Sequence, residues 1–191
     1  MEQKLFTELR LLYTTSRQTP ETIRIKIRMR DLIDPNALRH AVDTAMLRYP
    51  YFCVELQRKE GQYIFAENHR PVVISNSQHG IELNSAASNF HMIAFSWYKN
   101  WIIQDVFHAM TDGDGAYEVL RTLLYYYCSE RYHVNLRKEG IRLAGDNISL
   151  EEWIDPAAEA KNLPAPKRYE LEKAFSAVEA AGLQNDRQKT V

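Results

Sequence analysis

Hydrophobic and basic residues alternate without interruption from residue 23 to residue 30. The apolar positions are Ile23, Ile25, Ile27 and Met29, and the basic positions are Arg24, Lys26, Arg28 and Arg30. A period of two with β-branched residues predicts a strand that buries one face. Two interpretations of the basic face stay open. Its like charges discourage edge-to-edge pairing of strands, or one of its arginines meets a carboxylate or another anion.

Helical periodicity follows this strand. Asp34 is a suitable helix cap and Pro35 suits the first helical position, so a helix is expected to begin there and to end before Pro50. A second apolar stripe at helical spacing predicts a helix over residues 115–129 that packs on a core. A third amphipathic segment covers residues 168–181.

The remaining apolar segments are short and predict strands. They cover residues 51–56, 62–66, 91–97 and 101–107. Tyr98-Lys99-Asn100 joins the last two as a hairpin. Residues 67–90 are polar and predict a loop with a short strand at 72–74. Together the elements predict an α/β fold, a two-layer sandwich in which a mixed, largely antiparallel sheet carries helices on one face.

Composition excludes several classes of protein. The 191 residues are 45% hydrophobic and 26% charged, which is typical of a globular protein that buries a full core. The net charge of −1 gives no bulk attraction to nucleic acid or to an anionic membrane. Cys53 and Cys128 lie in apolar surroundings and predict buried thiols in a reducing compartment, and no apolar run reaches the length of a membrane span. We expect a cytoplasmic protein without a membrane span and without a nucleic-acid partner.

One segment carries candidate chemistry. His108 directly follows the strand 101–107, Asp112 comes four residues later, and Gly113 and Gly115 allow a tight turn before the helix. A histidine fixed at an exposed strand end is suited to proton transfer near neutral pH. Two ligand interpretations are weaker: no third metal ligand stands at a useful spacing, and the glycine spacing does not match a calcium loop. A plain turn with a structural histidine stays open.

His108-x-x-x-Asp112-Gly113 resembles the H-x-x-x-D-G motif of the chloramphenicol acetyltransferase-like superfamily, which includes condensation domains, alcohol acetyltransferases and polyketide-associated acyltransferases. The surrounding segments fall in the order of that family over roughly residues 20–130. They are the strand 23–30, the helix start at Asp34-Pro35, Arg48-Tyr49-Pro50-Tyr51-Phe52 and the helix that ends in Tyr125-Tyr126-Tyr127. Phe107 stands where peptide-synthetase condensation domains usually carry another histidine, which favours the acetyltransferase-like branches.

The resemblance implies a mechanism and a set of site residues. His108 would be the general base that removes a proton from an alcohol, amine or thiol, which then attacks a thioester of coenzyme A or of a carrier protein's phosphopantetheine. The thioester would be a co-substrate and not a permanently bound cofactor, and no metal is implied. Asp112 and Gly113 would be structural, Asp112 as the ion-pair partner of an arginine. The candidates for that arginine are Arg17, Arg24 and Arg28.

Two-lobed members of the superfamily are roughly twice as long as this chain. We therefore expect residues 1–160 to form a His-bearing N-terminal lobe, and residues 161–191, with Leu163-Pro164-Ala165-Pro166, to form a connector and helix leading towards an absent second lobe. A complete site would need that C-terminal lobe or a second subunit, and we expect an apolar, aromatic surface around His108. The alternative is a non-catalytic binding or assembly module that keeps the fold.

Overall fold

The computed structural model describes residues 3–4, 21–59 and 62–153. The expected connector and helix of residues 161–191, and Arg17, lie outside these ranges. The strands are β1 (Gln3–Lys4), β2 (Thr22–Arg28), β3 (Val54–Lys59), β4 (Gln62–Glu67), β5 (Ile74–Asn76), β6 (Ile93–Tyr98) and β7 (Trp101–Phe107). The helices are α2 (Pro35–Met46), α3 (Gly113–Tyr132) and the short 3₁₀ helices η1 (Pro50–Phe52), η2 (Ala86–Ser88) and η3 (Leu150–Trp153).

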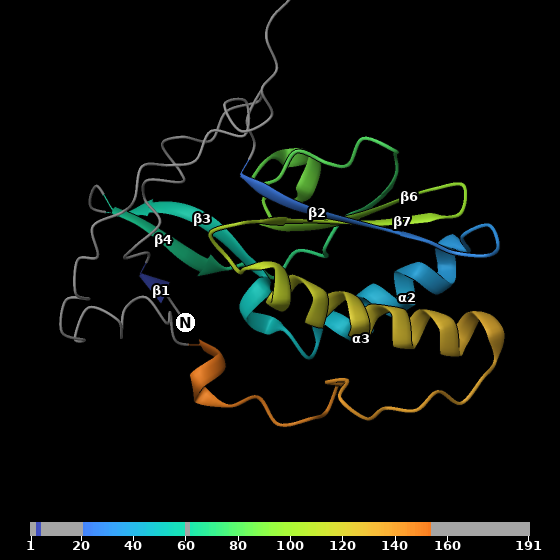
Figure 1. The fold of residues 1–191 in the computed structure, drawn as a ribbon. Helices are drawn as coiled ribbons and strands as arrows, with labels where there is room; N and C mark the ends of the chain where they lie inside the picture. The colour runs from blue at the N-terminus through green and yellow to red at the C-terminus, as the bar shows by residue number, and fades with distance from the viewer. Residues whose placement is uncertain (1–2, 5–20, 60–61, 154–191) are drawn as a thin grey trace, which may run out of the picture.

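The main sheet has the strand order β2-β7-β6-β5, with the antiparallel pairs β2–β7 and β7–β6 and the parallel pair β6–β5. Helices α2 and α3 lie side by side against one face of this sheet (Figure 1). The alternation in β2 sets that arrangement, because Ile23 and Ile25 point into the core beneath the helices while the basic residues point to the other face. The predicted α/β sandwich with a mixed, largely antiparallel sheet and helices on one face is confirmed.

The two helices form where the sequence predicts them. The Asp34 carboxylate caps α2 by accepting hydrogen bonds from the backbone N–H groups of Asn36 and Ala37, at 2.9 and 3.2 Å. The Asp34 N–H in turn donates to the hydroxyl of Tyr127 on α3, which ties the two helices together. Helix α3 begins two residues before and ends three residues after the expected range, and His133 ends it in a left-handed conformation.

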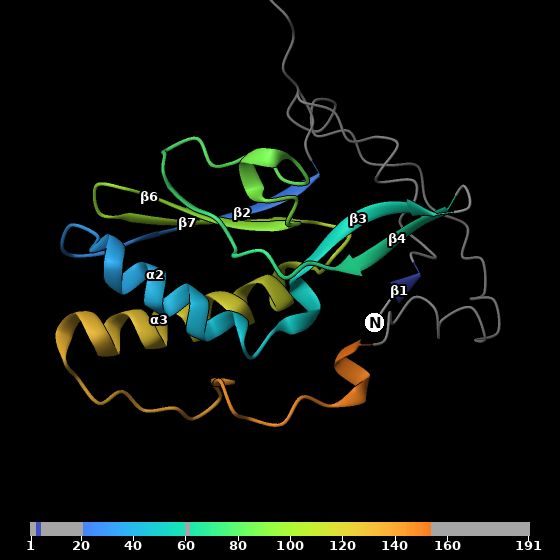
Figure 2. The same cartoon turned by 180° about the vertical axis from the view of Figure 1, so that it is seen from behind.

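Two features of the sheet region differ from the sequence expectation. Strands β3 and β4 do not join the main sheet but form a separate sheet with β1, in the order β1-β4-β3. The short strand expected at 72–74 lies at Ile74–Asn76, and Val72 is instead a buried core residue. Residues 77–91, which include η2, cover the face of the main sheet opposite the helices (Figure 2), so Ala94 and Ser96 on that face are fully buried.

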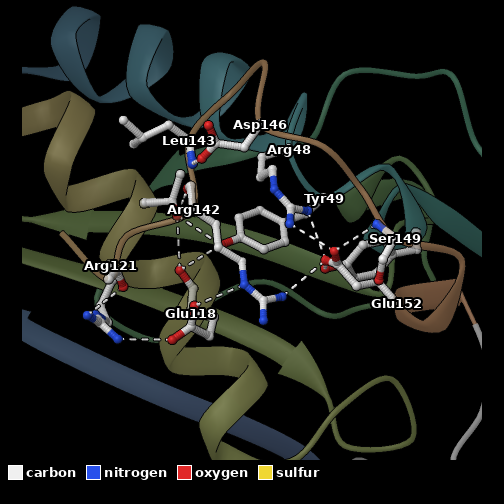
Figure 3. A network of polar contacts seen from close by, with 12 residues as sticks. Arg48, Tyr49, Glu118, Arg121, Arg142, Leu143, Asp146, Ser149 and Glu152 are labelled. Carbon is white, nitrogen blue, oxygen red and sulfur yellow. Dashed lines mark hydrogen bonds and ion pairs between the residues drawn. The ribbon is translucent and has the colours of Figure 1, made fainter. Parts of the chain in front are cut away.

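A segment after α3 returns along the helices and is fastened by one carboxylate. Both Glu152 oxygens accept hydrogen bonds from the Arg48 guanidinium at 2.9 Å. The Tyr51 hydroxyl, the Arg142 guanidinium and the Ser149 N–H also donate to this carboxylate, at 2.9 to 3.1 Å. Figure 3 shows Arg48 and Arg142 approaching Glu152 from two sides. The hydrogen bond from the Ser149 N–H is the local part of this anchorage, and the distant residues Arg48, Tyr51 and Arg142 supply the rest.

This anchorage predicts a pH dependence. The Arg48 hydrogen bonds, foremost among several donors, lower the pKa of Glu152 from its ordinary 4.5 to about 2. Because the folded-state pKa is depressed, the Glu152 carboxylate stabilises the fold above pH 4.5, and this contribution is lost as the pH falls from 4.5 towards about 2. We expect the difference in unfolding free energy between wild type and Glu152→Gln to shrink over that window.

Denaturant titrations at several pH values measure this difference. The matched control is Glu151→Gln, because Glu151 is the exposed neighbour of Glu152 on the same short helix. A wild-type advantage over Glu152→Gln that stays constant from pH 7 down to pH 2 would contradict the assignment.

Candidate active site

His108 stands one residue beyond the end of β7, where the main sheet meets the turn into α3. Its backbone N–H donates to the carbonyl of Glu21 at 2.8 Å, which extends the β2–β7 ladder by one hydrogen bond. Phe107 anchors the position from beneath, since it is buried in a small cluster with Val54 and Phe65 of the second sheet. The imidazole itself is exposed. The backbone of His108 is therefore fixed while its side chain faces outward.

The turn after His108 is also held. The Met110 N–H donates to the Phe107 carbonyl at 2.9 Å, and the Met110 side chain packs partly against the core. Asp112 is the N-cap of α3, where its Oδ1 accepts a hydrogen bond from the Gly115 N–H at 3.0 Å. A cap of this kind contributes about 1 kcal/mol to helix stability. The motif aspartate thus has a visible structural function in starting the helix.

Among the described residues, Asp112 makes no ion pair with an arginine. Arg24 pairs instead with Asp105, through Nε to Oδ1 at 2.6 Å and Nη2 to Oδ2 at 3.3 Å. The reason is the strand register, because Arg24 lies directly opposite Asp105 on the outer face of the sheet, whereas Asp112 lies beyond the end of β7. Arg28 lies over the ring of Trp101, 5.9 Å from its centroid. The candidate arginines Arg24 and Arg28 are therefore engaged elsewhere.

Asp105 is a buried charged residue that the sequence interpretation missed. Its side chain is only 1% exposed, and a buried carboxylate requires a cation or several hydrogen bonds. Gly80 of the covering segment packs directly over the Arg24–Asp105 pair, and a β-carbon at that position would overlap atoms of both side chains. The lone acid within the otherwise uncharged strand 101–107 was the signal that could have revealed this pair.

The two motif glycines have different surroundings. A β-carbon on Gly113 would meet nothing within 4 Å, whereas one on Gly115 would overlap the Thr111 hydroxyl. We expect Gly115→Ala to destabilise the fold by about 1–3 kcal/mol, because Thr111 must move and disturb the turn that holds His108. Gly113→Ala is the matched control, and we expect it to be neutral or slightly stabilising.

Thermal and denaturant unfolding of both variants checks this prediction. Adding Thr111→Ala to Gly115→Ala should restore most of the lost stability, since the overlapping hydroxyl is then absent. Equal stability of Gly113→Ala and Gly115→Ala would contradict the account of this turn.

The aromatic residues nearest to His108 in the sequence, Trp97, Tyr98, Trp101 and Phe107, do not form the expected aromatic surface around it. Phe107 is buried under the site, and Trp97 packs towards the helix core. Tyr98 and Trp101 lie at the hairpin turn, at the opposite end of β7 from His108 (Figure 1). Tyr117 on the first turns of α3 is half exposed at the His108 end of the sheet, and the sequence interpretation did not single it out.

The described residues were also compared with the requirements of a metal site and of a membrane-spanning helix. Residues 3–4, 21–59 and 62–153 contain no group of three or more His, Cys, Asp or Glu side chains that could hold a metal ion. Cys53 and Cys128 are free thiols, and burial raises the pKa of each. None of the helices in the described part of the chain has the length and apolar character that crossing a bilayer requires.

Comparison with known proteins identifies the fold. No family model and no curated protein matches the sequence. The structure is similar to the starter condensation domain of rhizomide synthetase RzmA, with a TM-score of 0.58 and 14% identity over 85% of this chain and 44% of that one. A doubly substituted form of the same domain gives a TM-score of 0.58 and 15% identity over the same shares. The chain therefore has a condensation-domain-like fold and spans less than half the length of the RzmA chains.

Proposed function

We propose that this chain is the His-bearing lobe of an acyltransferase that uses a thioester donor. The observation that carries the proposal is the position of His108 in the condensation-domain-like fold, with its backbone fixed by the sheet and its imidazole exposed. An imidazole held in this way can meet a substrate without reorganising its backbone, which favours proton transfer.

In the proposed reaction, His108 is the base that takes the proton of the acceptor and later returns it to the leaving group. The unprotonated imidazole nitrogen accepts the proton of an alcohol or amine as the oxygen or nitrogen lone pair attacks the thioester carbonyl carbon. The tetrahedral intermediate then collapses, the carbon–sulfur bond breaks, and the departing thiolate takes the proton from the imidazolium. The products are an ester or amide and a free thiol, and the imidazole returns to its starting state.

The remaining site residues have supporting functions in this proposal. Asp112 caps α3 and Gly113 leaves open space at the helix start, so the turn holds His108 without obstructing it. The donor is coenzyme A or the phosphopantetheine of a carrier protein, bound only during turnover. Residues 1–160 form the lobe and residues 161–191 lead towards a second lobe or a partner subunit that completes the site. We also propose a cytoplasmic location, consistent with the two free thiols.

Acceptor-dependent thiol release tests the proposal. The polypeptide as its native host produces it is mixed with acetyl-CoA, or with an acetylated carrier protein, and with a panel of alcohols and amines. We expect free thiol to appear only when an acceptor is present, together with an acetylated acceptor detected by mass spectrometry. If no donor and acceptor pair gives thiol release, the proposed acyltransferase activity is wrong, and a non-catalytic binding or assembly module with this fold is favoured.

A further inference from the structure

A second candidate site lies on the outer face of the main sheet, at the β6–β7 hairpin. It is an open pocket of about 600 Å³, a volume typical of small-molecule sites. Its lining consists of Lys26, Gln78, His79, Tyr98, Lys99, Trp101 and Ile103. Trp101 begins β7 and His108 follows its end, so roughly 24 Å separate them at about 3.4 Å per residue. This hairpin pocket is therefore distinct from the candidate active site.

The hairpin pocket is positively charged, and its lining contains no acidic side chain that would neutralise this charge. Lys26 comes from β2 and Lys99 from the hairpin turn, and no acidic residue lines the pocket. Neither ammonium group pairs with a carboxylate of the described residues. This differs from Arg24, two residues earlier on the same face, whose charge Asp105 neutralises. Cations that converge from separate elements without a protein counterion attract an anion.

Aromatic rings stand beside these cations. Tyr98 and Trp101 are a cross-strand pair at the end of the hairpin, and each is 36% exposed. The Lys99 Nζ lies 5.3 Å from the Tyr98 ring centroid, and the Arg28 guanidinium lies 5.9 Å from that of Trp101. Exposed aromatic faces next to cations can hold a planar ring by stacking while the cations bind its charged substituent.

Polar groups complete the surroundings. Gln78 Nε2 and His79 Nε2 lie 3.0 Å apart on the wall that the covering segment provides. Ile103 forms a buried apolar floor. Ser96 pairs with Ile103 across the two strands on this same face, and its buried Oγ has no hydrogen-bond partner among the described atoms. The pocket thus combines a positive rim, stacking surfaces and hydrogen-bonding groups.

We propose that the hairpin pocket binds a soluble phosphorylated ring compound of the nucleoside diphosphate class. Its phosphates contact Lys26 and Lys99, and its ring stacks on Tyr98 or Trp101. Two phosphates match the two lysines of the lining, and a planar base matches the exposed rings. The proposal does not depend on acyl transfer, because it concerns a separate surface.

Calorimetric titration of the full chain with ADP, adenosine and inorganic pyrophosphate tests the proposal by binding alone. We expect ADP to bind at least about tenfold more tightly than adenosine or pyrophosphate, since only ADP engages both the cations and the rings. Lys26→Gln combined with Lys99→Gln should weaken ADP binding by at least about tenfold. Arg30→Gln is the matched control, because Arg30 continues the basic stripe of β2 without lining the pocket, and it should change affinity less than about twofold.

Three results would overturn the proposal. They are no ADP binding at millimolar concentration, equal ADP affinity in wild type and the double lysine variant, and equal affinity for ADP and pyrophosphate. A fourth arm separates a soluble ligand from a lipid headgroup. If the protein sediments together with phosphatidylserine vesicles but does not bind ADP, the proposal of a soluble ligand is wrong and the pocket binds a membrane surface instead.

Discussion

Replacing Glu152 with alanine is expected to lower the unfolding free energy by about 3–5 kcal/mol, the usual cost of breaking a buried ion pair. The substitution leaves the Arg48 guanidinium, whose side chain is only 3% exposed, without its bidentate acceptor. It also removes the acceptor for the Tyr51 hydroxyl and the Ser149 N–H. The segment that returns along α2 and α3 would lose its main attachment to the end of α2.

Denaturant unfolding at neutral pH measures this loss. Glu151→Ala is the matched control and should change the unfolding free energy by less than about 0.5 kcal/mol, as an exposed substitution does. The double variant Arg48→Met/Glu152→Ala should be more stable than Glu152→Ala alone, because it leaves no buried guanidinium unpaired. An effect of Glu152→Ala as small as that of Glu151→Ala would contradict a structural function for this carboxylate.

Local periodicity explains which parts of the fold were predictable. The alternation in β2 and the cap at Asp34 are encoded within a few residues, and the structure places both elements as expected. The hairpin of β6 and β7 was equally predictable, because its strands are adjacent in the sequence and share one tight turn. Helix α3 was predicted with ends displaced by two or three residues, since its terminal turns carry few apolar residues.

Contacts between distant segments were not predictable in the same way. Arg24 and Asp105 are 81 positions apart, and only the pairing of β2 with β7 brings them together. Arg48 and Glu152 are 104 positions apart and meet because the segment after α3 reverses direction. The sequence left open whether an arginine of β2 meets a carboxylate, and the strand register decided that Arg24 pairs with Asp105.

The candidate site shows the same division. The order of strand, turn and helix placed His108 at an exposed strand end, as the structure has it. The Asp112 side chain caps α3. The sequence could have indicated this cap, because Asp112 directly precedes the glycines and the apolar stripe of the helix. Tyr98 ends β6 and Trp101 begins β7, and the direction of β7 puts their shared turn at the far end of the sheet from His108.

Replacing His108 with alanine is expected to lower the rate of acyl transfer by about 10²–10⁴-fold, the usual contribution of a general base. Without the imidazole, the acceptor must lose its proton to water or to the departing thiolate. The variant should fold normally, because the side chain is exposed and the hydrogen bond to Glu21 uses only the backbone. His69→Ala is the matched control, since His69 is a solvent-facing histidine whose side chain is 83% exposed on a loop.

The most direct test of the central claim compares the rate of acceptor-dependent thiol release by the native polypeptide with the rates of its His108→Ala and His69→Ala variants. The account predicts turnover by wild type and His69→Ala at similar rates, and loss of at least about a hundredfold in His108→Ala. Thiol release by His108→Ala at the wild-type rate would contradict the assignment of His108 as the general base.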